Sequence, residues 1–203
     1  MLKDIICLKV LQVIQLIEWL GTRWPAFGDW YRRVFYDKMI RSEAEKCSLR
    51  PGMKVLHIGS GPLPMTSISL SLIGFSVVAV DFDLTAIKEA KERVKELGLT
   101  KRIKFVQADG ADISSQGFDA VWISLHVQTK EKVLNKVYSD LKPGGKIVFR
   151  NSRDWLSLIY PQVDTEQAFP QMDYISLKQK IGKESIVLKK PSLAVNSKLP
   201  AAN

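Results

Sequence analysis

The sequence predicts an α/β protein in which a mostly parallel sheet of seven strands follows a helical cap. From residue 53 onward, short apolar runs alternate with amphipathic stretches, the order expected when helices cover both faces of a parallel sheet. Towards the C-terminus, two alternating polar and apolar stretches flank Gly182 and predict a hairpin that closes the sheet with one antiparallel strand. The expected strands are 53–58, 76–81, 102–106, 118–124, 145–150, 174–180 and 184–190, and the expected helices between them are 64–73, 84–97, 130–141 and a short one at 154–158.

The first fifty residues are expected to form a helical cap or lid. Residues 1–20 are very apolar, and polar residues recur at every third position from Lys9 to Glu18, which leaves a wide apolar face to be buried. The polar interruptions and the length argue against a transmembrane span, and we expect no signal peptide. Three surfaces could bury this face, and the sequence leaves all three open: the sheet domain, a second subunit in a homodimer, or a membrane surface.

An aromatic-rich stretch follows, and Pro25 is expected to end the first helix. A second helix is predicted over 29–47. Tyr36 and Glu43 lie seven residues apart on it and therefore share one of its faces.

The stretch at 55–68 organises the rest of the chain. It begins as an apolar, β-branched run typical of an inner parallel strand. Gly59 and Gly61 permit backbone angles and a close ligand approach that a Cβ would block. Pro62 and Pro64 suit the turn and the first positions of the following helix.

A Gly-x-Gly turn after a strand fits both dinucleotide and S-adenosylmethionine sites. Asp81 ends the next strand and can accept hydrogen bonds from both hydroxyls of a ribose. Leu63 and Pro64 stand where the dinucleotide fingerprint has its third glycine, so a pyrophosphate cradle is poorly supported. A ligand with a ribose but no phosphate fits better, and S-adenosylmethionine is the commonest.

Ligands of such Rossmann-like sheets bind outside the carboxyl ends of the strands. Asp109 follows the third strand, where methyltransferases place an acid near the adenine amino group; the alternative is a turn or N-cap Asp. Phe82 either stacks on adenine or packs. His57 is interpreted as a satisfied core histidine, and His126 lies at a crevice-facing strand end. The predicted cofactor-binding residues are Gly59, Ser60, Gly61, Pro62, Leu63, Asp81, Phe82, Asp109, Gly110 and Ser124.

Length and composition fit one ordinary binding domain, expected over 51–190, with the cap at 1–50 and a flexible tail at 191–203. The 203 residues are 46% apolar and 25% charged, which excludes disorder as the main state. The two cysteines have no metal-ligand spacing, so we expect neither a disulfide scaffold nor a metal site, and we expect a cytoplasmic protein.

The net charge of +9 from 30 basic and 21 acidic residues raises the question of an RNA or lipid partner. Basic and acidic residues are interleaved along 88–96, as on a solvated helix face, and no basic run carries aromatics at stacking intervals. A small anionic substrate is therefore preferred, and a nucleic-acid partner is disfavoured but left open.

Three segments carry a resemblance to a known family. Gly-Ser-Gly-Pro-Leu-Pro-x-Thr-Ser-Ile at 59–68 resembles the cofactor loop of nicotianamine synthases, which share the methyltransferase fold of the class I S-adenosylmethionine-dependent enzymes. Arg150, followed ten residues later by Tyr160-Pro161-x-Val163-Asp164, resembles that family's Arg…Leu-Tyr-Pro-x-Val-Asp segment, and residues 184–190 resemble its final strand more loosely. The likeness covers roughly residues 31–190.

The resemblance implies transfer of a 3-amino-3-carboxypropyl group from S-adenosylmethionine to an amine of a small, amino-acid-like acceptor, without a metal. It implies that Tyr36, Glu43 and Arg150 flank the acceptor, because the family carries a comparable Tyr with a Glu seven later. The alternative is that Tyr36 packs and Glu43 is solvated. Two other functions remain open: a methyltransferase acting on a small molecule or RNA, and a non-catalytic cofactor-binding module.

One departure from the family concerns the N-terminal region. Plant nicotianamine synthases carry a much longer helical region before the cofactor loop, whereas this chain has about fifty residues there. The acceptor pocket is therefore expected to be reduced, supplied by a second subunit, or different.

Overall fold

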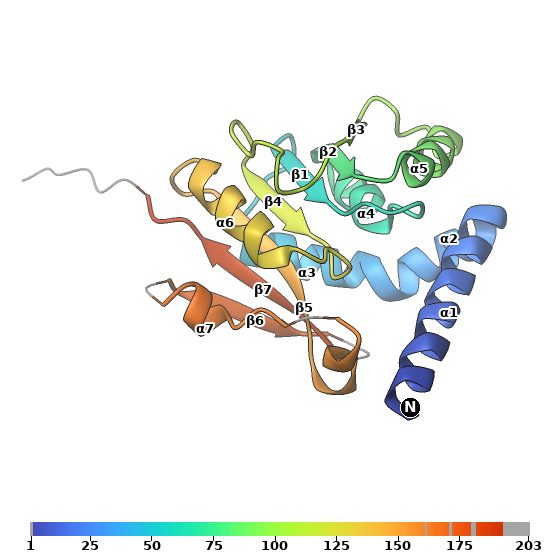
Figure 1. Ribbon diagram of the computed structural model, residues 1–203. Coiled ribbons are helices and arrows are strands. Elements are labelled where there is room, and N and C mark those ends of the chain that lie inside the picture. Colours follow the sequence, from blue (N-terminus) through green and yellow to red (C-terminus); the bar gives the residue numbers. More distant parts are fainter. Residues whose placement is uncertain (1, 161, 171, 180–181, 193–203) are drawn as a thin grey trace, which may run out of the picture.

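The computed structural model describes residues 2–160, 162–170, 172–179 and 182–192, apart from the side chains of 2–8, 11, 14 and 18. Its sheet has the strand order β3-β2-β1-β4-β5-β7-β6 (Figure 1). The first five strands are parallel, and β7 is antiparallel to both neighbours, so the predicted fold class is confirmed. The strands are β1 (Lys54–Ile58), β2 (Ser76–Asp81), β3 (Ile103–Gln107), β4 (Ala120–Ile123), β5 (Lys146–Ser152), β6 (Tyr174–Lys178) and β7 (Lys183–Lys189).

The four predicted helices of the sheet domain begin and end within one residue of their predicted bounds, whereas the short helix at Thr165–Ala168 was not predicted. Asp83 caps α5, its carboxylate accepting from the Thr85 N–H at 2.7 Å. Gly74 follows α4 at a φ of 111°, the left-handed conformation that ends many helices. The helices are α1 (Leu2–Arg23), α2 (Pro25–Arg32), α3 (Lys38–Lys46), α4 (Met65–Ile73), α5 (Leu84–Glu96), α6 (Lys130–Asp140) and α7 (Thr165–Ala168), with a π-helical η1 (Arg33–Asp37) and a 3-10 helical η2 (Asp154–Leu158).

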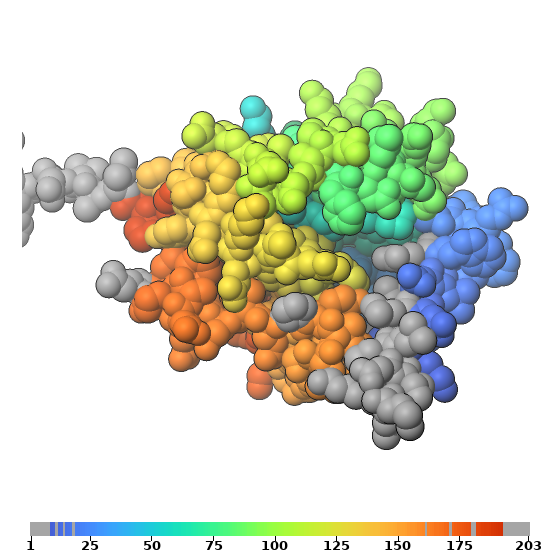
Figure 2. Space-filling view, in the orientation of Figure 1, coloured from blue at the N-terminus to red at the C-terminus, as the bar shows by residue number. Residues whose placement is uncertain are grey.

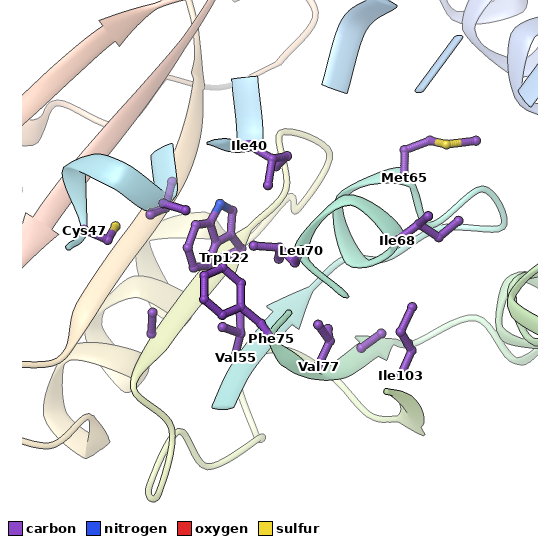
Figure 3. Packing of buried hydrophobic residues seen from close by; sticks show 14 of the residues in the cluster. Ile40, Cys47, Val55, Met65, Ile68, Leu70, Phe75, Val77, Ile103 and Trp122 are labelled. Carbon is purple, nitrogen blue, oxygen red and sulfur yellow. The ribbon is translucent and has the colours of Figure 1, made fainter. Parts of the chain in front are cut away.

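Alternate residues of each inner strand point to opposite faces of the sheet, and helices cover both. On one face, Val55 and Trp122 pack with residues of α3 and α4, and Figure 3 shows the Trp122 indole among Ile40, Leu70 and Phe75. On the other face, Leu56 and its neighbours pack against α6 and against Val163 and Phe169, which flank α7. Burial on both faces is why the strands read as nearly continuous apolar runs.

The N-terminal helices differ in detail from the prediction. The second helix begins at Pro25, four residues before the predicted start, because proline is well suited to a first helical turn. A π-helical turn then interrupts it at Arg33–Asp37, where Asp37 pairs with Arg32 at 2.5 Å and accepts from Ser69 at 2.7 Å. The contact with Ser69, which is 32 residues away along the chain, could not be read from the helical periodicity on which the prediction of this helix rested.

α1 packs against α2 at the edge of the molecule (Figure 1). Some of its apolar side chains line a cavity shared with the sheet domain, whereas Leu16 and Trp19 remain more than half exposed. Capping of the sheet domain is therefore partial. None of the helices in the described ranges combines the length and apolarity needed to cross a membrane. Residues 193–203 of the expected tail lie outside the described residues.

Candidate active site

A cavity of about 580 Å³ opens at the carboxyl ends of the parallel strands, around the point between β1 and β4 where the strand order reverses. Figure 2 shows the surface hollowed where the teal, yellow and blue parts of the chain meet. Of the predicted site residues, Pro62 and Glu43 do not line the cavity. Those that do are Tyr36, Gly59, Ser60, Gly61, Leu63, Asp81, Phe82, Asp109, Gly110, Ser124 and Arg150.

The loop after β1 needs both of its glycines. Gly59 has a φ of +78°, and a Cβ there would lie 2.7 Å from Val127 Cγ2. Gly61 has a φ of +64°, and no atom lies within 4 Å of where its Cβ would be. Backbone without side chains therefore faces the cavity, as a close ligand approach requires.

Asp81 fixes this loop from the end of β2. Its Oδ2 accepts from the Gly61 N–H at 2.7 Å, and its Oδ1 accepts from the Asp83 N–H at 3.1 Å. The side chain is 8% exposed and lines the cavity, so the carboxylate is oriented before any ligand arrives. Each carboxylate oxygen retains a lone pair that can accept from a ligand hydroxyl.

The other cofactor-binding candidates surround the same cavity. Asp109 accepts from the Ala111 N–H at 2.8 Å, which confirms a turn role, and it also lines the cavity. Gly110 leaves no room for a side chain, because a Cβ would lie 2.4 Å from Ile58 Cγ2. Ser60 Oγ is buried and has no hydrogen-bond partner among the described residues, and such an atom in a cavity wall suits a polar ligand atom.

Arg150, in β5, is a cation of the cavity wall and is 6% exposed. Its Nη1 donates to Thr66 Oγ1 at 2.8 Å, its Nη2 lies 3.4 Å from Glu43 Oε2, and its guanidinium carbon lies 5.7 Å from the centre of the Tyr36 ring. Its Nε has no partner among the described residues. A guanidinium with an unused donor is suited to binding a carboxylate.

Glu43 is fully buried behind Arg150 instead of reaching the cavity. Its carboxylate accepts from Trp122 Nε1 at 2.8 Å and from Ser185 Oγ at 2.5 Å. The alternative that Glu43 is solvated is therefore wrong. The Tyr36 ring lies over Arg150, so both residues of the predicted pair meet the same guanidinium.

The two histidines differ in setting. His57 is buried, with Nδ1 2.7 Å from Ser67 Oγ and Nε2 2.9 Å from Ser124 Oγ, which confirms a satisfied core histidine. Desolvation, reinforced by the charge of Arg150, lowers its pKa to about 3. His126 lines the cavity edge-on to Tyr160, and desolvation by the walls, followed by nearby lysine and arginine charges, lowers its pKa to about 4.

Two lysines were not predicted. Lys183 lines the cavity at the start of β7, and desolvation followed by the Arg150 charge lowers its pKa to about 8. Lys130, buried at the start of α6, donates to the Leu125 and Arg150 carbonyls at 3.1 and 2.9 Å, and burial lowers its pKa to about 8. Lys183 pairs with Ser152 in the antiparallel register of β5 and β7, which the hairpin signal in the sequence does not specify.

Solved structures share the fold at 16–20% identity. A Glu-to-Gln mutant of MtNAS in complex with S-adenosylmethionine superposes with a TM-score of 0.80 at 18% identity, over 93% of this chain and 77% of that one. MtNAS in complex with MTA and tNA superposes with a TM-score of 0.71 at 20% identity, over 87% of this chain and 67% of that one. An RNA methyltransferase from Salinibacter ruber in complex with S-adenosyl-L-homocysteine superposes with a TM-score of 0.60 at 16% identity, over 81% of this chain and 95% of that one.

Among curated proteins, the ubiquinone/menaquinone biosynthesis C-methyltransferase UbiE of Cronobacter sakazakii is 32% identical over 147 residues, which are 69% of this chain and 59% of that protein. UbiE of Pseudomonas syringae pv. syringae is 31% identical over the same length. The chain thus spans less than two thirds of these relatives. The family model "Nicotianamine synthase protein" matches residues 32–193, and because that range is most of the chain, the protein belongs to the nicotianamine synthase family.

Proposed function

We propose that the protein is an S-adenosylmethionine-dependent transferase that moves a 3-amino-3-carboxypropyl group to an amine of a small, amino-acid-like acceptor. The observation that carries the proposal is the charge arrangement of the 580 Å³ cavity. The carboxylates of Asp81 and Asp109 lie on its β2 and β3 side, and the cations Arg150 and Lys183 lie on its β5 and β7 side. One ligand with a ribose at one end and an amino-acid carboxylate at the other matches both sides.

The residues present fit such a ligand. Gly59 and Gly61 leave backbone open to a close approach, and Asp81 offers oriented acceptors for ribose hydroxyls. The unpartnered donor of Arg150 suits a carboxylate. When bound, S-adenosylmethionine supplies a carbon activated by its sulfonium: the acceptor nitrogen forms the new C–N bond, the C–S bond breaks, and the sulfur keeps the electron pair as methylthioadenosine leaves.

The chain's own residues prepare the acceptor. An amine must be neutral to attack, and the positive charges of Arg150 and Lys183 favour its neutral form. His126 is unprotonated at neutral pH because its pKa lies near 4, so its imidazole can accept a hydrogen bond from the N–H of the acceptor amine and is proposed to orient it, while the released proton passes to solvent. Tyr36 and Arg150 are proposed to flank the acceptor, and Glu43 is proposed as a positioning residue that holds Arg150.

Methyl transfer to a small molecule or RNA is the second candidate. It is favoured by the UbiE relatives, which are methyltransferases. The two reactions leave different adenosyl products from the same starting compound. Incubation with S-adenosylmethionine and a panel of amino acids, followed by liquid chromatography, is expected to yield methylthioadenosine. S-adenosylhomocysteine as the main product would reject the first candidate and favour the second.

We also propose a cytoplasmic location. The support is the thiol of Cys47, which is buried and free. Desolvation, with the nearby Glu43 charge, raises its pKa to about 12, so it is suited neither to a disulfide nor to metal binding. The homodimer through residues 1–20 stays one of the alternatives that the sequence leaves open, and a nucleic-acid partner stays disfavoured.

A further inference from the structure

A second cavity of about 360 Å³ adjoins the first. The two share a boundary, because six residues line both. The shared residues are Tyr36, Leu63, Met65, Leu125, His126 and Lys183.

The remaining wall of the second cavity is apolar and comes from two distant parts of the chain. α1 contributes Val10, Val13 and Ile17, and the η2 segment contributes Trp155 and Leu156 among others. Lys9 and Lys183 are the charged side chains among the lining residues that the structure describes, and both are cations. Such a wall favours a ligand with an apolar body and disfavours a positive charge on the part of the ligand that enters this cavity.

The position of this cavity separates it from the cofactor side of the site. None of the cofactor-binding candidates except Leu63 lines it, whereas Tyr36 and His126 of the proposed acceptor side do. The described residues of α1 that build its outer wall precede the range matched by the family model, which begins at residue 32.

We propose that the acceptor carries an extended apolar chain or ring that occupies the second cavity, with its nucleophilic nitrogen at the boundary beside Tyr36 and His126. This inference rests on the proposed function and names the substrate class of the same site. The apolar part would displace water from the α1 and η2 walls, and its removal from water supplies affinity in proportion to the area buried.

Calorimetry with straight-chain 2-amino acids tests the proposal, with the full chain saturated in methylthioadenosine, because their carboxylate complements the cations Arg150 and Lys183. The 2-amino derivatives of hexanoate, octanoate and decanoate are expected to bind progressively more tightly, by about fourfold for each added methylene until the cavity is filled. Affinity that is independent of chain length, while methylthioadenosine still binds, would overturn this inference alone. Absence of methylthioadenosine binding would overturn the proposed function as well.

Two matched variants on α1 locate the binding. Val13 lines the second cavity and Leu16 does not, yet their side chains are similarly exposed, at 55% and 53%. Val13→Asn is expected to weaken binding of 2-aminodecanoate about tenfold, because apolar contact is lost and an amide is desolvated, and to leave methylthioadenosine binding unchanged. Leu16→Asn is expected to change neither. Equal effects of the two variants on 2-aminodecanoate binding would overturn the placement in this cavity.

Discussion

Replacement of Glu43 by Gln tests the buried cluster behind the cavity, because the side chain keeps its shape and loses its charge. Glu43 is fully buried, with Trp122 Nε1 at 2.8 Å and Ser185 Oγ at 2.5 Å from its carboxylate. A Gln oxygen can still accept from Trp122, and its amide can donate to the Ser185 hydroxyl. The main change is that Arg150, whose Nη2 lies 3.4 Å from Glu43, loses its carboxylate partner.

The expected loss of stability follows from this geometry. A hydrogen bond to a charged group contributes about 1.5–3 kcal/mol, and removing one partner of a buried pair costs about 3–5 kcal/mol. The 3.4 Å separation is long, so we expect about 2 kcal/mol for Glu43→Gln. For a chain of this size that corresponds to a fall of about 4–8 °C in Tm. Glu43→Ala leaves two further donors unpaired and opens a void, so about 4 kcal/mol is expected.

Thermal unfolding followed by circular dichroism measures these losses, and a double-mutant cycle with Arg150→Met isolates the pair. The double variant is expected to be more stable than the summed single losses predict, by about 2 kcal/mol. Glu45→Gln, exposed on the same helix, is the matched control and should leave Tm nearly unchanged. Additive losses in the cycle, or an unchanged Tm in Glu43→Gln, would refute the coupling of Glu43 to Arg150.

Three further substitutions probe the loop and its supports. Gly59→Ala should cost about 2 kcal/mol more than Gly117→Ala in urea unfolding, because both glycines have similar positive φ but only at Gly59 would the Cβ meet a side chain at 2.7 Å. Equal losses would contradict this. His57 and His126 have folded pKa values of about 3 and about 4, below their usual 6.5, so each should lower stability by about 1.4 kcal/mol per unit as pH drops from 6.5. In His57→Gln the slope should fall by about 1.4 kcal/mol per unit, and an unchanged slope would argue against the contribution of His57. Lys130→Met leaves two carbonyls without their donor and should lower the free energy of unfolding by about 2 kcal/mol. Lys132→Met, at an exposed position, is the control and should leave stability nearly unchanged. Equal stability of the two variants would exclude a structural role for the Lys130 hydrogen bonds.

Local signals in the sequence were sufficient for most of the fold. The apolar runs of the strands act over a few residues, so each predicted its strand to within about two residues. The Asp83 cap is equally local and stands directly before the predicted start of α5. The glycine loop and Asp81 were also readable, because a strand-turn-helix unit fixes their relative positions. The predicted cofactor-binding residues, apart from Pro62, consequently line one cavity.

The acceptor side of the site depends on partners that are distant along the chain. Glu43 meets Trp122 and Arg150 across 79 and 107 residues, and no periodicity in the second helix reveals those contacts. Lys183 reaches the cavity only because β7 pairs with β5 in a register that sets it opposite Ser152. Lys130 stands in a run of alternating charges that reads as a solvated helix face, and only its burial against two carbonyls reveals otherwise.

The central claim is that an adenosyl group binds beside the glycine loop with its ribose on Asp81. Titration calorimetry with methylthioadenosine tests it most directly, comparing the wild-type chain with Asp81→Asn after both have been checked for folding by circular dichroism. The account predicts one-to-one binding to the wild type and at least about tenfold weaker binding to the variant, as expected when a charged acceptor is lost. No heat with the wild type, or equal affinity in both, would contradict it.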